Sequence, residues 1–447
     1  MMNPATNAVS DAPVSFHPAS SPDYVPREQL CGLQSRRLRQ VVGRAYEHVA
    51  LFRQRMHKLG LTPADIRGVD DIRMLPFTTK ADLSDAYPIG MLTVPIQQIV
   101  HLHPTSGITG RPIVVGYTRR DLESWTEVIV RCLASCGIHQ GDVVQNACGY
   151  NLFIDGLGLH YGAETLGATV IPISGGDTDH QIMVMKDFSV SAICCTPSYF
   201  MYLVEKAEKL GIDLRELPLR AGAFVTDSWS DAMRRRIEES AGIKAYDIYG
   251  LPEIIGPGIG AECCHQNGLH IFEDHFYPEI VDPESGDLLG DGEEGELVLT
   301  TLNREAMPLI RYRTPDLAAI IAEPCQCGRT MRRIRRIARR GGEMCVVEGV
   351  SVFPSQIEAA LMTVEGALPN YQIVLTQEKG LDRVEVQIEV TARIISDQIG
   401  AMEGLQSKLA DEIEHSLGIR VPVRLVEPHT IGRSSDGNKR VVDRRAN

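Results

Sequence analysis

Apolar residues recur at helical spacing near the start of the chain. Between Arg27 and Leu59 they stand three or four positions apart with arginines among them, so the pattern predicts one amphipathic helix whose arginines face solvent. Residues 1 to about 25 show no such period and are rich in Ala, Ser, Pro and Asn, which predicts a loose segment. The apolar positions of the helix are Leu30, Leu33, Leu38, Val41, Ala45, Val49 and Phe52.

Short apolar runs then alternate with helical patterns. Residues 167–173 and 191–195 have the composition of buried strands, whereas residues 161–166 and 199–210 have helical spacing. Alternation of strand and helix is typical of sheets that are covered by helices. We therefore expect an α/β fold whose large N-terminal domain, residues 26–340, consists of helix-covered β-sheets.

A second, smaller domain is predicted for residues 341–447. Its patterns follow a βαββαβ-like order, which is typical of a compact α+β unit, here a mobile lid on the larger domain. The basic run at residues 331–340 would lie at the hinge between the two domains. We expect most of its arginines to form a charged face exposed to solvent. The segments are 345–352 (strand), a helix from Pro354, 372–376 and 384–390 (paired strands), 396–417 (helix) and 421–427 (strand).

Composition narrows the class of protein. The chain has 447 residues, of which 43% are hydrophobic, and this is enough for a large core and two domains. A formal charge of −13 argues against a dedicated binder of nucleic acid or of an anionic membrane. We find neither an apolar span of membrane length nor a signal-peptide core, so we expect a cytoplasmic protein. Eleven cysteines, an odd number, favour reduced thiols over a disulfide framework.

The stretch TSGITGRPIVVGYT at residues 105–118 combines hydroxyls, glycines and a basic residue before a β-branched run. Glycine lets backbone N–H groups approach an anion, while hydroxyls and an arginine supply further donors, so this turn suits phosphate. It is not a Walker A loop, because no GKS or GKT follows, and an ordinary hairpin turn is the alternative. The residues concerned are Thr105, Ser106, Gly107, Thr109, Gly110 and Arg111.

Three further blocks accompany this loop. They read YDIYGLPE at residues 246–253, GELVLTTLNREAMPLIRYRTPD at 295–316 and GVSVFPSQIE at 349–358. In order and approximate spacing, the four blocks resemble those of the phenylacetate-CoA ligase family of adenylate-forming enzymes. The resemblance implies that ATP and Mg²⁺ convert a carboxylic acid, aryl or arylacetic, to an acyl adenylate that then passes to a thiol such as coenzyme A. The acceptor could instead be a carrier-protein thiol or an amine. A homodimer is also left open.

The resemblance also assigns roles within the nucleotide site. It implies that the loop holds the β- and γ-phosphates, that Glu253 binds Mg²⁺, that Asp316 accepts the ribose hydroxyls and that Tyr249 covers adenine. Arg340 resembles the arginine that neutralises charge near the ribose. Outside matching blocks, each of these residues would read as an ordinary surface or core residue. Asp227, Asp247 and Gly250 complete the predicted nucleotide-binding residues.

By the same resemblance, the acid binds against residues 150–158 and 174–176. Aromatic and aliphatic walls suit a flat or apolar acid. Asp155 stands where the family commonly has a small residue. Facing inward it could bind an amine or a hydroxyl of the acid, and facing outward it would cap the following turn. The predicted acid-binding residues are Tyr150, Asn151, Phe153, Asp155, Ser174, Gly175 and Gly176.

Four residues form a candidate metal site. Cys325 and Cys327 make a CxCG turn, and Cys263, or its neighbour Cys264, precedes His270 by a few positions. Three cysteines and one histidine would hold Zn²⁺ tetrahedrally and tie two loops together, in a structural role because no coordination position stays open. Similar members of the family carry such a zinc ion. The alternative is a few reduced thiols and a surface histidine.

Departures from the family pattern surround the nucleotide site. Ile108 replaces a phosphate-facing threonine, and VTDSW at residues 225–229 replaces GAEPW. An ungapped match sets Gly437 against the lysine that reaches the α-phosphate, and Lys439 is the candidate substitute. Loss of that cation would remove about 3 kcal/mol of barrier lowering. The rival hypothesis is therefore a diverged member without efficient adenylation, which acts on a preactivated acyl group or as a ligand-binding or partner protein.

Overall fold

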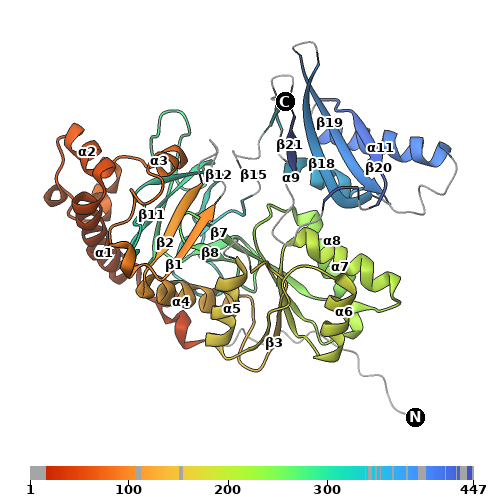
Figure 1. Ribbon diagram of the computed structural model, residues 1–447, viewed down its shortest axis with the longest axis horizontal. Coiled ribbons are helices and arrows are strands. Elements are labelled where there is room, and N and C mark those ends of the chain that lie inside the picture. Colours follow the sequence, from red (N-terminus) through yellow and green to blue (C-terminus); the bar gives the residue numbers. More distant parts are fainter. Residues whose placement is uncertain are drawn as a thin grey trace.

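The computed structural model shows two bodies. In Figure 1 the large body carries the red to teal part of the chain, and a smaller blue body of C-terminal residues stands next to α8 (Asp231–Ala241). The described residues are 17–105, 112–150, 155–337, 339–340, 345–347, 350–352, 354–364, 367–378, 381–390, 399–417, 419–428, 430–432 and 440–444.

The large body is built around a mixed sheet. Within the described residues its strand order is β13-β14-β9-β8-β7-β6-β5-β3-β4. The half from β4 to β7 is parallel, whereas the half from β7 to β13 is antiparallel. The strands are β3 (Val143–Asn146), β4 (Thr169–Ile171), β5 (Ala192–Cys195), β6 (Ala221–Phe224), β7 (Lys244–Leu251), β8 (Gly256–Ala261), β9 (Leu269–Ile271), β13 (Ile320–Ile321) and β14 (Arg333–Ile334).

Helices cover the parallel half of this sheet, as the alternating pattern predicted (Figure 1). Polar N-caps mark where several of them begin, because a side-chain oxygen satisfies a free backbone N–H; Thr118, Thr196 and Ser230 act in this way. The helices are α3 (Lys80–Asp85), α4 (Arg119–Ser135), α5 (Asp155–Leu166), α6 (Thr178–Asp187), α7 (Pro197–Lys209) and α8, with 3-10 helices at Pro63–Asp65, Val69–Met74, Ile96–Gln98 and Leu214–Glu216.

Two further sheets complete the large body. One is antiparallel with the strand order β10-β11-β12-β15, and in the other β1 pairs with β2. Arg340 of β15 stands opposite Asp316 of β12. The strands are β1 (His101–Thr105), β2 (Ile113–Tyr117), β10 (Phe276–Val281), β11 (Gly295–Thr301), β12 (Tyr312–Ala318) and β15 (Arg339–Arg340).

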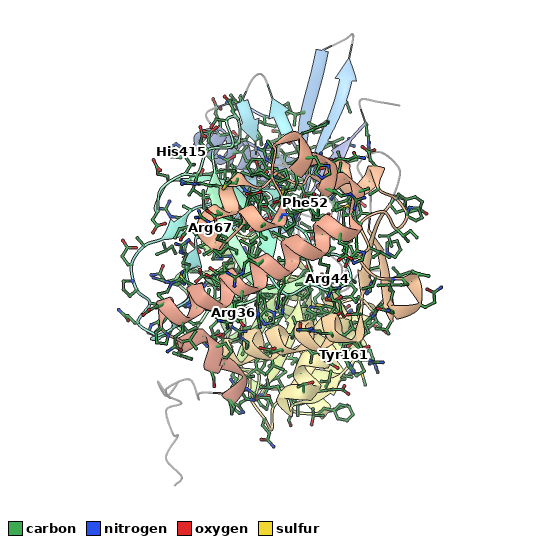
Figure 2. All side chains as sticks on the ribbon, turned by 90° about the vertical axis from the view of Figure 1, so that its left-hand side faces the viewer. Arg36, Arg44, Phe52, Arg67, Tyr161 and His415 are labelled. Carbon is green, nitrogen blue, oxygen red and sulfur yellow. The ribbon has the colours of Figure 1, made fainter. Side chains whose placement is uncertain are left out.

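The first amphipathic pattern forms two helices, α1 (Arg27–His48) and α2 (Ala50–Lys58), where one was predicted. Val49 separates them, because its backbone is extended (φ −99°, ψ 104°) while its side chain stays in the core. Figure 2 shows α1 crossing the front of the molecule with Arg36 and Arg44 along it. The break lets the apolar faces of both helices reach the same core.

The segment predicted to be loose is ordered from Pro18 onward. Residues Pro18–Tyr24 form a 3-10 helix whose Asp23 is fully buried. The Asp23 carboxylate accepts hydrogen bonds from Arg131 Nη2 (2.6 Å) and Arg329 Nε (2.9 Å). The prediction is therefore wrong for these residues, because buried ion pairs, which composition cannot reveal, anchor them.

Two glycines let α5 approach α4 closely. A Cβ atom on Gly158 would lie 2.1 Å from Trp125 Cζ2, and one on Gly162 would lie 2.1 Å from Ile129 Cγ2. The Trp125 indole N–H donates to the Pro257 carbonyl oxygen (2.9 Å), which fixes the helix pair to β8. This packing determines where the first turn of α5 lies.

The smaller body is an α+β unit. Its main sheet has the order β20-β19-β18-β21, in which only β18 and β19 are antiparallel neighbours. Glu358 of α9 is buried and accepts a hydrogen bond from the Ser230 N–H (3.0 Å), which joins the two bodies. Its elements are β16 (Cys345–Val347), β17 (Val350–Val352), α9 (Pro354–Met362), β18 (Ala367–Glu378), β19 (Leu381–Val390), α11 (Ile399–Leu417), β20 (Val423–Val426) and β21 (Val441–Asp443).

The basic run holds buried arginines where a solvated face was predicted. Arg333 is 3% exposed and donates to the Glu323 carbonyl oxygen (2.6 Å). Arg336 donates to the carboxylates of Asp231 (2.7 Å) and Asp247 (3.1 Å). The prediction is wrong for both arginines, because tertiary contacts supply acceptors that the local sequence does not show. Arg335, between them, is exposed as predicted.

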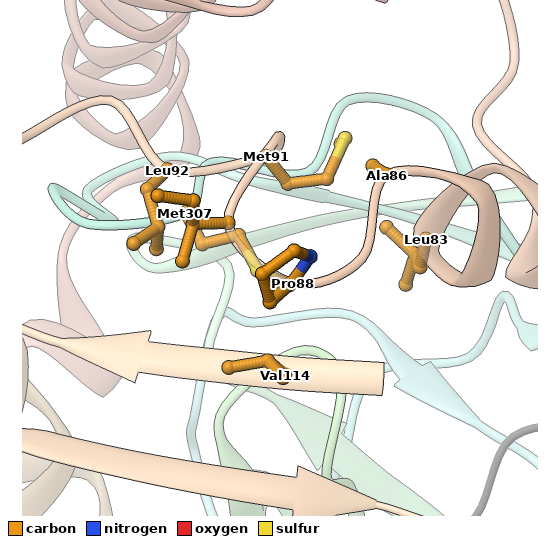
Figure 3. A pocket seen from close by; sticks show the side chains of 8 residues that line it. Leu83, Ala86, Pro88, Met91, Leu92, Val114 and Met307 are labelled. Carbon is orange, nitrogen blue, oxygen red and sulfur yellow. The ribbon is translucent and has the colours of Figure 1, made fainter. Parts of the chain in front are cut away.

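A small apolar pocket lies between α3 and β2 (Figure 3). Its walls include Leu83, Met91, Val114 and Met307, and none of the predicted site residues lines it. We therefore look for the functional site elsewhere. Among the helices that the structure describes, none combines the length and the apolarity needed to cross a bilayer.

Candidate functional site

The parallel strands bring candidate residues to one edge of the central sheet. β3, β6 and β7 end at this edge and lead to Tyr150, Asp227 and Glu253 respectively. Ligands of open α/β sheets bind outside the carboxyl ends of such strands. The topology therefore collects at one place residues that lie about a hundred positions apart in the sequence.

A hydrogen bond joins Tyr249 to Asp316. Tyr249 Oη donates to Asp316 Oδ2 (2.6 Å), and both side chains are buried. Tyr249 lies on β7 and Asp316 on β12, so the bond connects the two large sheets. A carboxylate is an acceptor of hydrogen bonds alone, which is the chemistry that ribose hydroxyls need. Arg340, predicted to act beside Asp316, is its backbone neighbour across the β12–β15 pair.

Glu253 follows β7 in a tight turn and pairs with Lys80. Lys80 Nζ lies 3.0 Å from Glu253 Oε1, and the Glu253 side chain is buried. Burial raises the pKa of the nearby Tyr312 hydroxyl, and the negative charges of Glu253 and Asp316 raise it further. Both carboxylates therefore lie close to Tyr312, in a buried region where a cation or a phosphate group would interact strongly with them or with Lys80.

Two more predicted acids have fixed partners. Asp227 Oδ2 accepts a hydrogen bond from Ser198 Oγ (2.6 Å), and Asp247 Oδ2 accepts one from Arg336 Nε (3.1 Å). The Arg336 guanidinium also stacks over the Trp229 ring, 4.4 Å from its centroid. These contacts hold the wall of the site, and a direct role of the two acids in nucleotide binding stays a prediction.

Asp155, the first residue of α5, points toward the carboxyl end of β6. Its Oδ2 accepts a hydrogen bond from Thr226 Oγ1 (2.6 Å). Thr226 has a φ of 75°, a left-handed backbone that β-branched residues rarely adopt. A role of this carboxylate in binding the acid stays a prediction.

The other described acid-binding candidates have contacts of their own. Tyr150 Oη accepts a hydrogen bond from Asn146 Nδ2 (2.8 Å) and lies 3.2 Å from His160 Nδ1. Tyr199 Oη donates to the Gly176 carbonyl oxygen (3.3 Å). Ser174, with φ 62°, and Gly175 precede it in the loop after β4.

Part of the predicted site lies outside the described residues. Of the phosphate-binding turn only Thr105 is described, as the last residue of β1 opposite Ile113 of β2, so the turn joins two antiparallel strands. That pairing agrees with a hairpin and does not decide between the two hypotheses for the turn. The candidates outside the description are Ser106, Gly107, Thr109, Gly110, Arg111, Asn151, Phe153 and Lys439, together with Gly437.

The four metal candidates come together. Their ligand atoms all lie within 4.8 Å of one another, although Cys263 and Cys327 stand far apart in the sequence. Cys263 Sγ lies 3.7 Å from Cys325 Sγ, and Cys327 Sγ lies 3.3 Å from His270 Nε2. Two sulfurs at about 2.3 Å from one tetrahedral zinc ion would lie about 3.8 Å apart, so the donors fit this metal.

The charge state of the cysteine cluster also suits a metal. The Cys263 thiol hydrogen-bonds to Cys327 and lowers the pKa of Cys327 to about 2. Thiolate is the form of cysteine that binds metals. Cys264 is exposed, whereas Cys263 is buried, so Cys263 is the member of the pair that belongs to the cluster.

Sequence reasoning did not find several residues of the site. Lys80, Arg336, Ser198 and Thr226 each contact a predicted site residue, but none of them was itself predicted as a site residue. Thr226 lies in a segment that was singled out for its departure from the family. The local sequence around Lys80 carries one signal, the N-cap Thr79, which predicts the start of a helix at Lys80 but no role in the site.

Comparisons with known proteins agree with this geometry. The model of the AMP-binding enzyme family matches residues 61–303, and that of the AMP-binding enzyme C-terminal domain matches residues 349–445. A phenylacetate-coenzyme A ligase of Thermus thermophilus is 42% identical over 437 residues, 95% of this chain and 98% of the relative. The same enzyme of Pseudomonas putida is 44% identical over 413 residues, 92% of this chain and 93% of the relative.

Solved structures match along the whole chain. 2-Hydroxyisobutyryl-CoA ligase in the postadenylation state, in complex with an acyl-AMP, has a TM-score of 0.88 and 27% identity, and the match covers 97% of this chain and 94% of that chain. The same ligase in the thioesterification state, with coenzyme A, has a TM-score of 0.69 at 28% identity, over 96% of this chain and 94% of that chain. The fold is therefore that of the adenylate-forming enzymes.

Proposed function

Because the chain belongs to the phenylacetate-CoA ligase family of AMP-binding, adenylate-forming enzymes, we propose that it uses ATP to activate an arylacetic acid such as phenylacetate and transfers the acyl group to coenzyme A. The observation that carries the proposal is the group formed by Tyr249, Asp316, Glu253 and Lys80 at the carboxyl edge of the sheet. In one region it offers Asp316 as an acceptor of hydrogen bonds from the ribose hydroxyls, Glu253 as a ligand for Mg²⁺ and Lys80 as a cation.

The first step joins the acid to AMP. A carboxylate oxygen attacks the α-phosphorus of ATP, and pyrophosphate leaves with the electrons of the broken bond. Asp316 would orient the ribose through its hydroxyls, and Tyr249, held by its bond to Asp316, would position the base. Glu253 would hold Mg²⁺, which neutralises phosphate charge when bound. Negative charge grows during this step, so a nearby cation lowers the barrier.

Lys80 is our candidate for a cation on the large domain. The predicted lid cation is in doubt, because Gly437 stands at the usual lysine position and Lys439 is the substitute. Lys80 already lies 3.0 Å from the candidate Mg²⁺ ligand, so its ammonium group would sit near the polyphosphate. We propose that it supplies part of the missing charge stabilisation.

The second step transfers the acyl group. The sulfur of coenzyme A attacks the acyl carbon, and AMP leaves. The small domain here resembles the postadenylation arrangement of 2-hydroxyisobutyryl-CoA ligase (TM-score 0.88) more than its thioesterification arrangement (0.69). We propose that the small domain, residues 341–447, turns between the two steps, with the hydrogen bond from Ser230 to Glu358 holding the first arrangement.

Zinc is proposed at the cysteine cluster. Cys263, His270, Cys325 and Cys327 would use all four tetrahedral positions, so the ion would be structural and would tie the loop after β8 to the loop before β14. The sulfur and nitrogen distances support this assignment.

The test follows AMP and pyrophosphate. Purified protein with ATP, Mg²⁺ and phenylacetate should catalyse pyrophosphate exchange without a thiol. When coenzyme A is added, it should release AMP and form the acyl-CoA thioester. Asp316→Ala and Glu253→Ala should lower both rates by at least a hundredfold, because each removes a ligand contact of the transition state. The exposed Asp187→Asn, at the end of α6, is a control for carboxylate loss.

Two outcomes would count against the proposal. Unchanged rates in Asp316→Ala and Glu253→Ala would reject the assigned roles. A folded protein that exchanges no pyrophosphate with any aryl or alkyl acid would favour the diverged hypothesis. Supplying a presynthesised acyl adenylate separates the steps, since a protein that has lost only adenylation still transfers this acyl group to coenzyme A.

A further inference from the structure

A cavity lies between α1, the start of α4 and the loop after β11. Its volume is about 520 Å³, and pockets of about 300–1,000 Å³ are the usual size of small-molecule sites. None of the predicted site residues is among the described residues that line it. The lining consists of Arg37, Gln40, Val41, Arg44, Glu47, His48, Arg120, Leu302, Asn303, Arg304 and Glu305.

The lining of this cavity is polar and carries more positive than negative charge. Of its eleven residues, Val41 and Leu302 are the apolar ones, and four are arginines against two glutamates. An aryl group would gain little here, because its burial is favourable only against apolar surface. Guanidinium groups bind phosphate and carboxylate through parallel N–H donors. The cavity therefore suits a small polar anion.

One face of α1 forms the first wall of the cavity. Arg37 and Arg44 stand two helical turns apart, and His48 follows one turn later, so the three side chains share a face. Arg44 is labelled on α1 in Figure 2. Its Nη2 lies 3.7 Å from Glu305 Oε1, which is an ion pair but too long for a hydrogen bond. Arg44 can therefore turn to a ligand at little cost.

Arg37 lies where several positive charges meet. Its Nη1 donates to the Asp274 carbonyl oxygen, but its ion pair with the Asp274 carboxylate is long, 4.0 Å. That carboxylate already accepts hydrogen bonds from Arg131. Burial lowers the pKa of Arg37, and the charges of Arg131 and Arg120 lower it further, although Asp274 and Glu127 oppose these effects. An anion at Arg37 would offset this repulsion.

Two other arginines of the lining have few partners. Arg120, the second residue of α4, is exposed and makes no hydrogen bond or ion pair with the described residues. Arg304 is 2% exposed, and its Nε and Nη1 have no hydrogen-bond partner among the described residues. Its Nη1 lies 3.9 Å from Asp121 Oδ1, an oxygen that already accepts from the Glu305 N–H (2.7 Å). The charge of Arg304 therefore adds to the positive potential of the cavity.

The cavity is separate from the predicted phosphate-binding turn. Thr105 and Ile113 border the turn at one end of the β1–β2 pair. Tyr117 ends β2 at the other end, and α4 with Arg120 follows directly. β2 is five residues long, which spans about 16 Å. An anion beside Arg120 therefore occupies a different place from the polyphosphate of the predicted ATP site.

We propose that this cavity binds a small molecule that carries phosphate groups, through Arg37, Arg44 and Arg120, as a second anion site outside the nucleotide site. Gln40 and Glu47 are exposed and offer acceptors for hydroxyl groups of the bound molecule. The site does not depend on the proposed ligase function, because none of its residues takes part in that chemistry.

Pyrophosphate is the probe, titrated by calorimetry into the full chain without Mg²⁺ or an acid. Arg120→Glu reverses one charge of the lining and Arg44→Gln removes another, so each should weaken binding at least tenfold. Arg119→Glu makes the same change at the neighbouring exposed position, which is not among the described residues of the lining, and should bind within twofold of wild type. A carboxylate is favourable in the first turn of a helix, so α4 tolerates both replacements.

Two further measurements separate this site from the adenylation site. The rate of pyrophosphate exchange with ATP should stay within twofold of wild type in all three variants, because the predicted active-site residues are unchanged. If the protein catalyses no exchange, the proposed function fails while the calorimetric comparison still decides this inference. Tungstate, a tetrahedral oxyanion that anomalous diffraction locates, should lie beside Arg37 and Arg120 in soaked crystals.

Four results would overturn the inference. Pyrophosphate affinity that is unchanged in Arg120→Glu and Arg44→Gln would place binding elsewhere, as would tungstate found only away from the cavity. Equal weakening in Arg119→Glu and Arg120→Glu would show a diffuse attraction without a site. Malonate, a dicarboxylate, bound as tightly as pyrophosphate would reject the assignment to phosphate.

Discussion

Individual side chains in the site combine opposite charges at short range. Lys80 and Glu253 pair at 3.0 Å, and the partner of each is supplied by a different part of the chain. In a buried region such charges interact more strongly than in water, and a phosphate or a divalent cation that enters can exchange partners with them. At this scale Lys80 matters most, because the resemblance to the family sets Gly437 at the position of the usual lid lysine.

Replacing Lys80 tests its proposed part in adenylation. Lys80→Ala should slow pyrophosphate exchange about a hundredfold, which corresponds to roughly 3 kcal/mol of lost transition-state stabilisation. Lys80→Arg keeps the charge and should recover part of the rate. Lys58→Ala, at the exposed end of α2, is the matched control. An exchange rate in Lys80→Ala within threefold of wild type would exclude the role.

Elements determine how accurately these side chains are placed. The first residue of α5 is Asp155, and the position of α5 depends on the contact of its glycines with α4. Interiors pack closely, so an added methyl group at such a contact forces the helices apart or the side chains from their rotamers. The loops around β8, β9 and β14 depend in a similar way on the cysteine cluster.

An alanine at Gly162 should destabilise the protein by about 1–3 kcal/mol, because its methyl group would overlap Ile129 of α4. A methyl group on Gly43 of α1 would have no neighbouring atom within 4 Å, so Gly43→Ala should be neutral or stabilise by up to about 1 kcal/mol. Urea unfolding of both variants measures the difference. Equal stabilities would show that the two helices are not in tight contact at Gly162.

Removing one ligand tests the cysteine cluster. We expect one zinc ion per chain by elemental analysis, and Cys327→Ser should lose it and lower the thermal midpoint by several degrees, because four ligands tie distant loops together. Cys264→Ser changes the exposed neighbour of Cys263 and should keep the metal. Wild-type protein that contains no zinc after growth and purification with zinc would contradict the assignment.

At the scale of the whole molecule, buried charges connect segments far apart in the sequence. Arg131 of α4 contacts Asp23 from the N-terminal 3-10 helix and Asp274 from the loop after β9. His275 lies beside Asp274 (3.2 Å) and Glu127 (3.6 Å). Breaking such a network leaves a buried charge without its partner, so its members stabilise the fold together.

This network predicts a pH dependence of stability. Burial alone would lower the pKa of His275, but the Asp274 carboxylate and the Glu127 hydrogen bond outweigh burial and Arg131, and raise it above 6.5. Its contribution to stability is therefore fully present below about pH 6.5 and is lost as pH rises through the raised pKa. Between pH 6 and 9 the thermal midpoint of wild type should fall relative to that of His275→Asn.

The control for this measurement is His415→Asn, an exposed histidine of α11 that Figure 2 labels. It should follow the wild-type pH profile. Parallel profiles of wild type and His275→Asn across pH 6 to 9 would show that His275 does not titrate in this window.

The sequence by itself determined what depends on local pattern. Alternating apolar runs predicted the helix-covered sheet, the βαββαβ-like order predicted the small C-terminal unit, and the blocks around Glu253 and Asp316 identified the family. Local patterns carry this information because helix and strand periods, turns and ligand-binding loops are encoded over a few neighbouring residues.

Only the tertiary structure decided which distant residues meet. It paired Lys80 with Glu253, turned Asp155 toward Thr226, buried Asp23 in a segment that composition marked as loose, and brought Cys263 to Cys325. The physical reason is that an ion pair or a hydrogen bond between residues far apart in the chain depends on the crossing of strands and helices, and neither partner carries a local sign of the other.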